Sequence, residues 1–254
     1  MSSAIEVNGV TRRFGDFVAV SDASFSVATG EIFGFLGPNG AGKTTTIRML
    51  TGLLRPSAGT ARVAGLDVGQ HAQQLRARIG YMSQSFSLYG DLTVRENIEL
   101  FAGLYGVSGE RLARRTAWVL EMAGLEGRER GLTAELPLGF KQRLALGCAV
   151  LHEPAILFLD EPTSGVDPLA RRAFWDLIHA LAHNGTTVLV STHYMEEAEY
   201  CDRLLLMNRG RIIAEGTPAA LRALVEPDEA LGGAPSLEDV FVALVQREGG
   251  AVAG

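Results

Sequence analysis

The sequence is poor in cysteine and nearly devoid of lysine. Its 254 residues contain two cysteines, Cys148 and Cys201, and among the 23 basic residues only Lys43 and Lys141 are lysine. Two cysteines without a repeated spacing exclude a disulfide framework and favour a reducing compartment. Because arginine supplies all the other basic residues, the two remaining lysines are candidates for special roles.

Long apolar runs and an excess of positive charge are also missing. No run approaches the roughly 20 residues that cross a bilayer, and the first residues lack the charged-then-apolar layout of a signal peptide. The net charge of -6 argues against a duplex nucleic-acid partner, which needs a basic face to displace counterions, although it does not exclude a local basic patch. If the protein works at a membrane, we expect it to act from the cytoplasmic side through a partner.

Short apolar runs alternate with helical patterns along most of the chain. Strands are predicted at residues 5–7, 25–27, 32–36, 59–63, 79–82, 156–159, 187–190, 203–207 and 211–214. Helices are predicted at about 42–53, 94–105 (after a capping box of Thr93 and Glu96), 112–123, 137 or 138 to 151, and 169–182, with a shorter segment at 195–201. Strands separated by helices imply an α/β fold with a largely parallel sheet and a mainly helical insertion at about 85–151.

The last part of the chain differs in composition from the rest. After Leu224 it is rich in Pro, Gly and acidic residues until Ser236. There Ser236 and Asp239 can cap a helix whose apolar stripe is Leu237, Val240, Phe241 and Leu244. We therefore divide the chain into a domain at 1–225 and a tail at 226–254, with a short amphipathic helix at about 236–246.

The stretch GPNGAGKT follows one predicted strand and opens a predicted helix. This context makes the spacing of its glycines, Lys43 and Thr44 a phosphate-loop signal, whereas a glycine-rich turn without a ligand is the alternative. Glycines let the backbone N–H groups point at phosphate oxygens, and the helix N-terminus adds partial positive charge. Lys43 supplies a compact charge for the outer phosphates and Thr44 a hydroxyl for Mg2+. The predicted nucleotide-binding residues here are Gly37, Pro38, Asn39, Gly40, Ala41, Gly42, Lys43, Thr44 and Thr45.

A second apolar strand ends in two carboxylates, Asp160 and Glu161. Asp160 can hold a Mg2+-bound water and Glu161 can polarise an attacking water. The alternative is a strand that ends in a solvated acidic turn. The presence of the phosphate loop favours the catalytic interpretation.

Seven sequence pieces occur in an order and spacing that resemble the ATPase subunits of ABC transporters over residues 4–225. The pieces are Phe14 in RRFG, the phosphate loop, Gln84 in YMSQ, Lys141 to Arg143, LFLDEP, SGVD from Ser164 to Asp167, and STH from Ser191 to His193. Alone, Phe14 fits a core residue, Gln84 a turn residue, Asp167 a helix cap and His193 a structural histidine.

The resemblance implies a P-loop NTPase core with an N-terminal antiparallel β subdomain and a helical insertion subdomain, and it implies ATP and Mg2+ as cofactors. Phe14 would stack on adenine, and Gln84 would meet Mg2+ or the lytic water and sense the transmembrane partner. Glu161 would be the general base, His193 would contact the γ-phosphate, and Asp167 would communicate across a dimer interface. In this family two ATPase domains sandwich two ATPs, each between one phosphate loop and the other subunit's signature.

The signature itself departs from the family pattern of Leu-Ser-Gly-Gly-Gln, because residues 136–140 read LPLGF. Pro137 removes a hydroxyl and an N–H group, while Leu138, Gly139 and Phe140 still offer amides to a phosphate. Loss of one charge-assisted hydrogen bond should cost about 1.5–3 kcal/mol, which is impairment rather than abolition. The alternative is that Leu138 and Phe140 simply pack.

The resemblance implies an ATP-hydrolysing subunit at the cytoplasmic face of the cell membrane that powers a separate permease. The SLEDVF tail is similar to exporter ATPases of the drug and antibiotic-efflux type, so we favour export. A second ATPase subunit would complete a homodimer or a heterodimer. The alternatives are a soluble ABC-type ATPase acting on nucleic acid or ribosomes, and a regulatory subunit of a heterodimeric transporter with weak activity of its own.

Overall fold

The computed structural model describes residues 3–84, 88–225 and 235–251. The larger sheet has the strand order β10-β9-β3-β8-β7-β6. Its strands are β3 (Ile32–Leu36), β6 (Ile79–Met82), β7 (Ile156–Asp160), β8 (Thr187–Thr192), β9 (Arg203–Asn208) and β10 (Arg211–Gly216). All neighbours pair in parallel except β10 with β9. The carboxyl ends of β3, β7 and β8 therefore meet at one edge.

A smaller antiparallel sheet has the order β2-β1-β4-β5. It consists of β1 (Ser3–Phe14), β2 (Phe17–Ala28), β4 (Ala58–Val63) and β5 (Leu66–Asp67). The predicted α/β class, with an antiparallel N-terminal part, is confirmed. The first two strands are much longer than predicted because each pairs along its length with the other, a long-range feature that local sequence pattern does not show.

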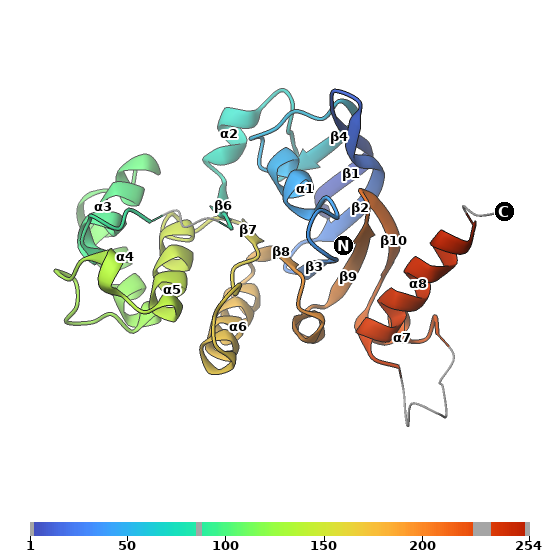
Figure 1. Cartoon of the computed structure of the whole chain (residues 1–254). Helices are drawn as coiled ribbons and strands as arrows, with labels where there is room; N and C mark the ends of the chain where they lie inside the picture. Colours follow the sequence, from blue (N-terminus) through green and yellow to red (C-terminus); the bar gives the residue numbers. More distant parts are fainter. Residues whose placement is uncertain (1–2, 85–87, 226–234, 252–254) are drawn as a thin grey trace.

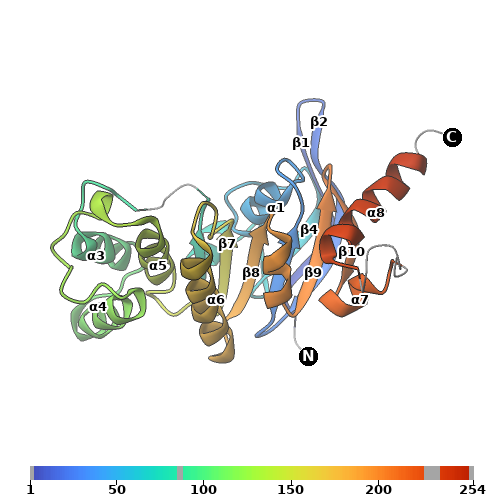
Figure 2. The ribbon, with the colours of Figure 1, turned by 60° about the horizontal axis from the view of Figure 1, so that its bottom comes forward.

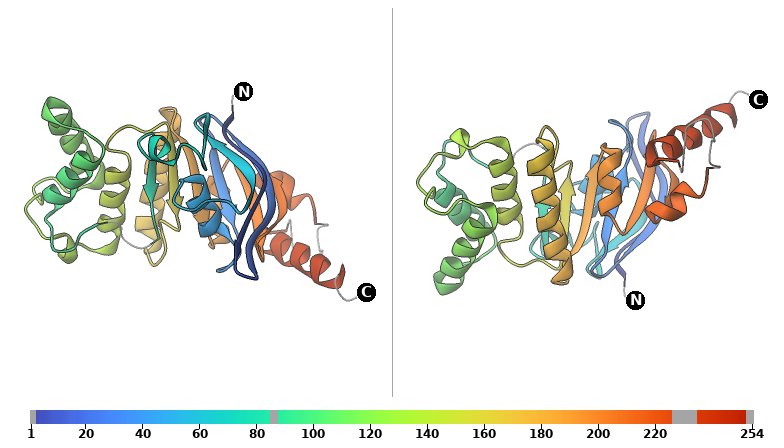
Figure 3. Two further views of the ribbon diagram at one scale, coloured as in Figure 1. Left: turned by 90° about the horizontal axis from the view of Figure 1, so that it is seen from above. Right: turned by 90° about the horizontal axis from the view of Figure 1, so that it is seen from below.

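The helices surround the two sheets (Figure 1). They are α1 (Lys43–Leu50), α2 (Ala72–Arg76), α3 (Val94–Leu104), α4 (Gly109–Ala123), α5 (Leu138–Ala149), α6 (Pro168–His183), α7 (Pro218–Arg222) and α8 (Leu237–Ala251), with 3-10 turns η1 (Thr133–Glu135) and η2 (Met195–Tyr200). Helices α3, α4 and α5 form a helical lobe at one end of the molecule, and α7 and α8 lie at the other end (Figure 3). Helix α6 lies between the lobe and the strands of the large sheet (Figure 2). Within the described ranges, no helix is both long and apolar enough to span a bilayer.

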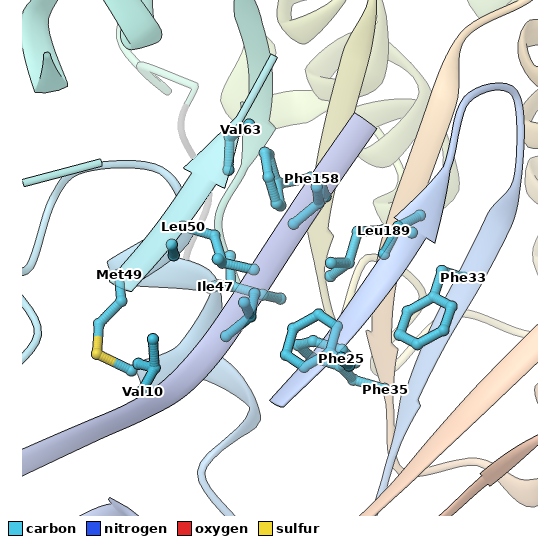
Figure 4. Close-up of a cluster of buried hydrophobic side chains, with 14 of the residues drawn as sticks. Val10, Phe25, Phe33, Phe35, Ile47, Met49, Leu50, Val63, Phe158 and Leu189 are labelled. Carbon is cyan, nitrogen blue, oxygen red and sulfur yellow. The ribbon is translucent and has the colours of Figure 1, made fainter. Parts of the chain in front are cut away.

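Alternate residues of the central strands enter different cores. Phe33 and Phe35 of β3 belong to a cluster that joins both sheets and α1, together with Phe25 of β2, whose ring centroid lies 5.3 Å from that of Phe35 (Figure 4). Ile32 and Leu36 face the opposite side, where the second cluster includes α5, α6 and α8. Because both faces are covered, these strands are continuous apolar runs rather than alternating ones. A third cluster fills the helical lobe.

The capping predictions are confirmed at two helices. Thr93 and Glu96 form the capping box of α3, and Ser236 accepts from the Asp239 N–H while Asp239 accepts from Ser236 at the start of α8. Leu237 and Val240 of α8 are buried in the second core. The predicted tail at 226–254 lies partly outside the described residues, and the division at residue 225 stays a prediction.

Several element predictions were incomplete. Helix α1 ends at Leu50 rather than near residue 53, and residues 195–200 form a 3-10 turn. Helices α2 and α7 and strand β5 were not predicted. These three elements have five or fewer residues, too few for a periodic pattern.

Candidate functional site

The phosphate loop joins β3 to α1, as its sequence predicts. Gly37 adopts a φ of 156° and Gly42, the N-cap of α1, a φ of 105°. A Cβ atom would lie 2.2 Å from the Met207 carbonyl oxygen at Gly37 and 2.8 Å from the Ala19 carbonyl oxygen at Gly42. Both positions therefore need glycine, since a side chain would push the loop off β9 and β2.

Lys43 lies at the centre of the loop and is 3% exposed. Its Nζ donates to the carbonyl oxygens of Gly37 at 2.7 Å and Pro38 at 3.1 Å. The same atom lies 3.2 Å from Glu161 Oε1, in a pair that is almost fully buried. A compact ammonium with three donors fits this geometry, whereas the planar guanidinium that the chain uses elsewhere is larger and differently shaped.

Asp160 ends β7 directly beside the first turn of α1. Its Oδ1 accepts from Thr44 Oγ1 at 2.9 Å and from Ser191 Oγ at 2.7 Å. Its Oδ2 is buried and has no hydrogen-bond partner within the described ranges. Burial raises the pKa of this carboxyl, while the two hydroxyl donors act in the opposite direction. An unpaired buried carboxylate oxygen next to a threonine hydroxyl is a suitable arrangement for a hard divalent cation.

Glu161 is the meeting point of the other predicted groups. Gln84 Nε2 donates to its Oε2 at 3.0 Å, and His193 Nδ1 lies 3.1 Å from the same oxygen. The Glu161 N–H donates to Ser191, and its φ of 50° turns the residue out of the strand direction. The three residues predicted to be catalytic, Glu161, His193 and Gln84, are thus brought together with Lys43.

A cleft of about 280 Å³ lies over the phosphate loop. It is lined by Phe17, Ala19, Asn39, Gly40, Ala41, Gly42, Lys43, Thr44, Thr45, Gln84 and Glu161. Phe14 is not among these lining residues. It pairs with Phe17 across the end of the β1–β2 hairpin, and the Arg12 guanidinium lies 4.5 Å from its ring centroid. The cleft therefore presents Phe17 as an aromatic wall, and the adenine-stacking role of Phe14 stays a prediction.

The altered signature begins α5, with Pro137 as its N-cap. The prediction that Phe140 offers a free amide is wrong, because the Phe140 N–H donates to the Pro137 carbonyl oxygen at 3.0 Å. The Phe140 ring is packed between Arg143 and Arg128, whose guanidinium carbons lie 4.5 Å and 5.3 Å from its centroid. For Phe140, the packing interpretation therefore has direct support.

Gly139, predicted to bind nucleotide, does not line the cleft of its own chain. A Cβ atom there would lie 3.0 Å from Ala170 Cβ of α6. Asp167 is the N-cap of α6 and accepts from the N–H groups of Leu169 and Ala170. The signature and residue 167 thus lie on a surface beside the α5–α6 contact.

Two residues of the site were not assigned by the sequence. Ser191 was recognised only as part of STH, yet its hydroxyl donates to Asp160 and accepts from the Glu161 N–H. Phe17 pairs with Phe14 across the end of the hairpin, and the cleft lining includes Phe17 but not Phe14. Aromatic residues on both sides of the short turn at Gly15 and Asp16 were the sequence signal that could have suggested Phe17, whereas the role of Ser191 depends on strand pairing.

Comparisons with known proteins agree with this geometry. A family model described as ABC transporter matches residues 20–164, and a model described as AAA domain, putative AbiEii toxin, Type IV TA system, matches residues 133–197. A solved structure described as the ATP binding subunit of an ABC transporter has a TM-score of 0.83 at 32% identity, covering 95% of this chain and 99% of that one.

Two relatives are named as ATP-binding proteins of transporters. The chain is 51% identical over 243 residues to the probable multidrug ABC transporter ATP-binding protein YbhF of Escherichia coli (strain K12), covering 96% of this chain. It spans only 42% of that protein's length. It is 46% identical over 218 residues to the Nod factor export ATP-binding protein I of Burkholderia orbicola (strain AU 1054), covering 85% of this chain and 72% of that protein.

Replacing Asp160 by asparagine is expected to raise the thermal unfolding midpoint of the nucleotide-free protein at neutral pH. Burial raises the pKa of this carboxyl, so its ionised form opposes folding, and the advantage of asparagine should fade as the pH falls to the ordinary value of 3.8. Calorimetry across this pH range measures the difference. The exposed control Asp91→Asn should show no such trend, and a pH-independent loss in Asp160→Asn would contradict the expectation.

Replacing Phe17 by alanine is expected to weaken ATP binding by about five- to a hundredfold, because one stacked base is worth about 1–3 kcal/mol. Titration of a fluorescent ATP analogue measures the affinity. Phe14→Ala is the matched variant. An equal loss of affinity would indicate that both rings stack on the base, and unchanged affinity would indicate that Phe17 stacks without Phe14. Unchanged affinity in Phe17→Ala would rule out the aromatic wall.

Proposed function

This chain belongs to the ABC transporter family of ATP-binding proteins, and we propose that it binds and hydrolyses ATP to power a separate membrane permease. One observation carries the proposal. The Glu161 carboxylate, at the end of a strand beside the phosphate loop, is contacted by Lys43, Gln84 and His193. A cation for phosphate and two polar side chains thus converge on one carboxylate base at the cleft, as phosphoryl transfer to water requires.

The Lys43–Glu161 ion pair suggests how ATP prepares its own hydrolysis. Lys43 Nζ has three donors, and its three acceptors are Gly37, Pro38 and Glu161. A terminal phosphate in the cleft competes with Glu161 for this ammonium. Once released from Lys43, the Glu161 carboxylate is free to accept a proton from the attacking water, while Gln84 and His193 hold it in place.

Mg2+ is the cation that we propose for the site. Thr44 Oγ1 and the unpaired Asp160 Oδ2 are the groups that would hold it, and Gln84 is among the residues that line the same cleft. When bound, Mg2+ neutralises charge on the phosphate oxygens. Ser191 then keeps the Asp160 carboxylate oriented through Oδ1.

A second ATPase subunit is part of the proposal. The cleft of this chain is lined mainly by residues of the phosphate loop. Among the described residues, none that lines it comes from the signature. The signature of one subunit would therefore close the cleft of the other, in a homodimer or in a heterodimer whose partner has the usual signature. The Pro137 N-cap, which offers no side-chain hydroxyl, supports a weakened contribution from this chain.

The permease would bind at a groove between the large sheet and the helical lobe. This groove has a volume of about 690 Å³ and is lined by Thr51, Leu53, Gln73, Arg76, Ala77, Ile79, Tyr81, Phe101, Leu104 and Tyr105. Leu53 and Leu104 are 50% and 71% exposed, so apolar surface is available for a partner. The name of one relative, a Nod factor export ATP-binding protein, supports export, and a subunit that powers a membrane permease would act at the cytoplasmic face of the cell membrane.

Glu161→Gln is expected to lower ATP hydrolysis by at least about a hundredfold, because positioned general bases contribute that much or more. ATP affinity should stay the same or rise, since a neutral amide competes less for the Lys43 ammonium. Phosphate release and nucleotide titration of the purified chain measure the two effects. The exposed Glu196→Gln is the control, and undiminished hydrolysis by Glu161→Gln would overturn the proposal.

Restoring the usual signature tests whether its departure matters. Pro137→Ser with Leu138→Gly and Phe140→Gln is expected to raise ATPase activity about ten- to a hundredfold, the equivalent of one charge-assisted hydrogen bond. Phe140→Gln alone is the control for lost packing between Arg128 and Arg143. If the triple variant has unchanged activity, the departure affects packing only.

A further inference from the structure

Arg171 of α6 links the two chain segments on either side of the Glu161 carboxylate. The first segment, residues 163–167, follows Glu161, and the second, residues 193–197, begins with His193. The Arg171 side chain is 17% exposed and faces inward, whereas its neighbour Arg172 is exposed. Arg171 is thus a partly desolvated cation that none of the roles described above uses.

Its guanidinium touches both segments. Arg171 Nη2 donates to the Val166 carbonyl oxygen at 3.3 Å, and the guanidinium carbon lies 4.1 Å from the Tyr194 ring centroid. The Tyr194 ring in turn lies 4.2 Å from the His193 ring. A continuous series of contacts therefore runs from Arg171 over the Tyr194 ring to the His193 imidazole, which is tilted by 36° to that ring and contacts Glu161.

A buried carboxylate makes the second connection. Glu197 is 1% exposed, lies 3.5 Å from Arg171 Nε, and accepts from Thr163 Oγ1 at 2.5 Å. A buried carboxylate is stable only when it is paired and hydrogen-bonded. Arg171 and Thr163 supply these partners at Oε1, from α6 and from the first segment, while Oε2 has no hydrogen-bond partner among the described residues. Displacement of residues 163–167 would separate Glu197 from Thr163, and displacement of residues 193–197 would separate it from both partners.

We propose that Arg171, paired with Glu197, is a positioning residue that holds His193 in register with residues 163–167. The inference rests on the proposed ATP hydrolysis, because it assigns Arg171 to the alignment of His193 and Glu161. The same contacts connect residues 163–167, which lie near the signature surface, to the His193 imidazole. A change at that surface is then transmitted to the cleft through Val166, Arg171 and Tyr194.

Arg171→Lys keeps the charge but cannot make the carbonyl, carboxylate and ring contacts together. We expect kcat to fall about ten- to a hundredfold, as misplacement of a catalytic group by about 1 Å does, with ATP affinity within about twofold. The matched control Arg172→Lys should match the wild type. A kcat within about twofold of the wild type in Arg171→Lys would overturn the proposal.

A double-mutant cycle separates positioning from general destabilisation. In a His193→Ala background, Arg171→Lys should lower the single-turnover rate by less than about twofold, because nothing remains to be positioned. A further loss as large as in the wild-type background would overturn the proposal.

Hydrogen exchange of the full chain gives a readout that does not depend on activity. In Arg171→Lys, amides of both 163–167 and 193–197 should exchange faster than in Arg172→Lys. Faster exchange in neither or in only one segment would overturn the link. If wild-type protein and Arg172→Lys do not hydrolyse ATP at all, the proposed function fails, whereas the exchange result still decides the role of Arg171.

Discussion

The parallel pairing of β3, β8 and β7 is the constraint on which the site depends. Leu36 lies opposite Thr192, and Asp160 lies opposite Ser191. Each strand therefore ends level with its neighbour, and the segments that follow them begin at one edge of the sheet. The phosphate loop, the two carboxylates and the histidine come from distant parts of the sequence. This strand register brings them together at one edge of the sheet.

The apolar side chains on both faces of the sheet stabilise the strands, but they also place the carboxylates at this edge in a poorly solvated environment. Phe158 and Leu159 are fully buried on opposite sides of β7, so the next two residues are carboxylates in a poorly solvated place. Asp160 keeps one oxygen unpaired, and Glu161 adopts a left-handed backbone conformation that most residues avoid. Unpaired buried charge and local strain are concentrated where a ligand can relieve them, which is typical of functional sites.

Local signals in the sequence predicted most of the large sheet and the phosphate loop. Strands at 32–36 and 79–82 have the predicted bounds, because apolar runs and flanking turn residues are read locally. The role of Ser191 depends on the register of β7 and β8, and the position of Phe17 depends on a hairpin, so neither follows from local pattern. The Phe140 amide was misjudged because the first turn of α5 is tight: the Phe140 N–H bonds the carbonyl oxygen three residues back, at Pro137, and this backbone detail is not specified by local pattern.

The scarcity of lysine has a practical consequence. Lys43 is buried in the phosphate loop, and Lys141 lies on the signature helix, where its Nζ donates to the Ala134 carbonyl oxygen at 2.7 Å. One lysine side chain of this sequence therefore lies in the phosphate loop, and the other lies on the helix that begins with the altered signature. An amine-directed reagent has only these two side-chain targets, so labelling of Lys43 reports on the cleft over the phosphate loop, and labelling of Lys141 reports on the surface that carries the altered signature.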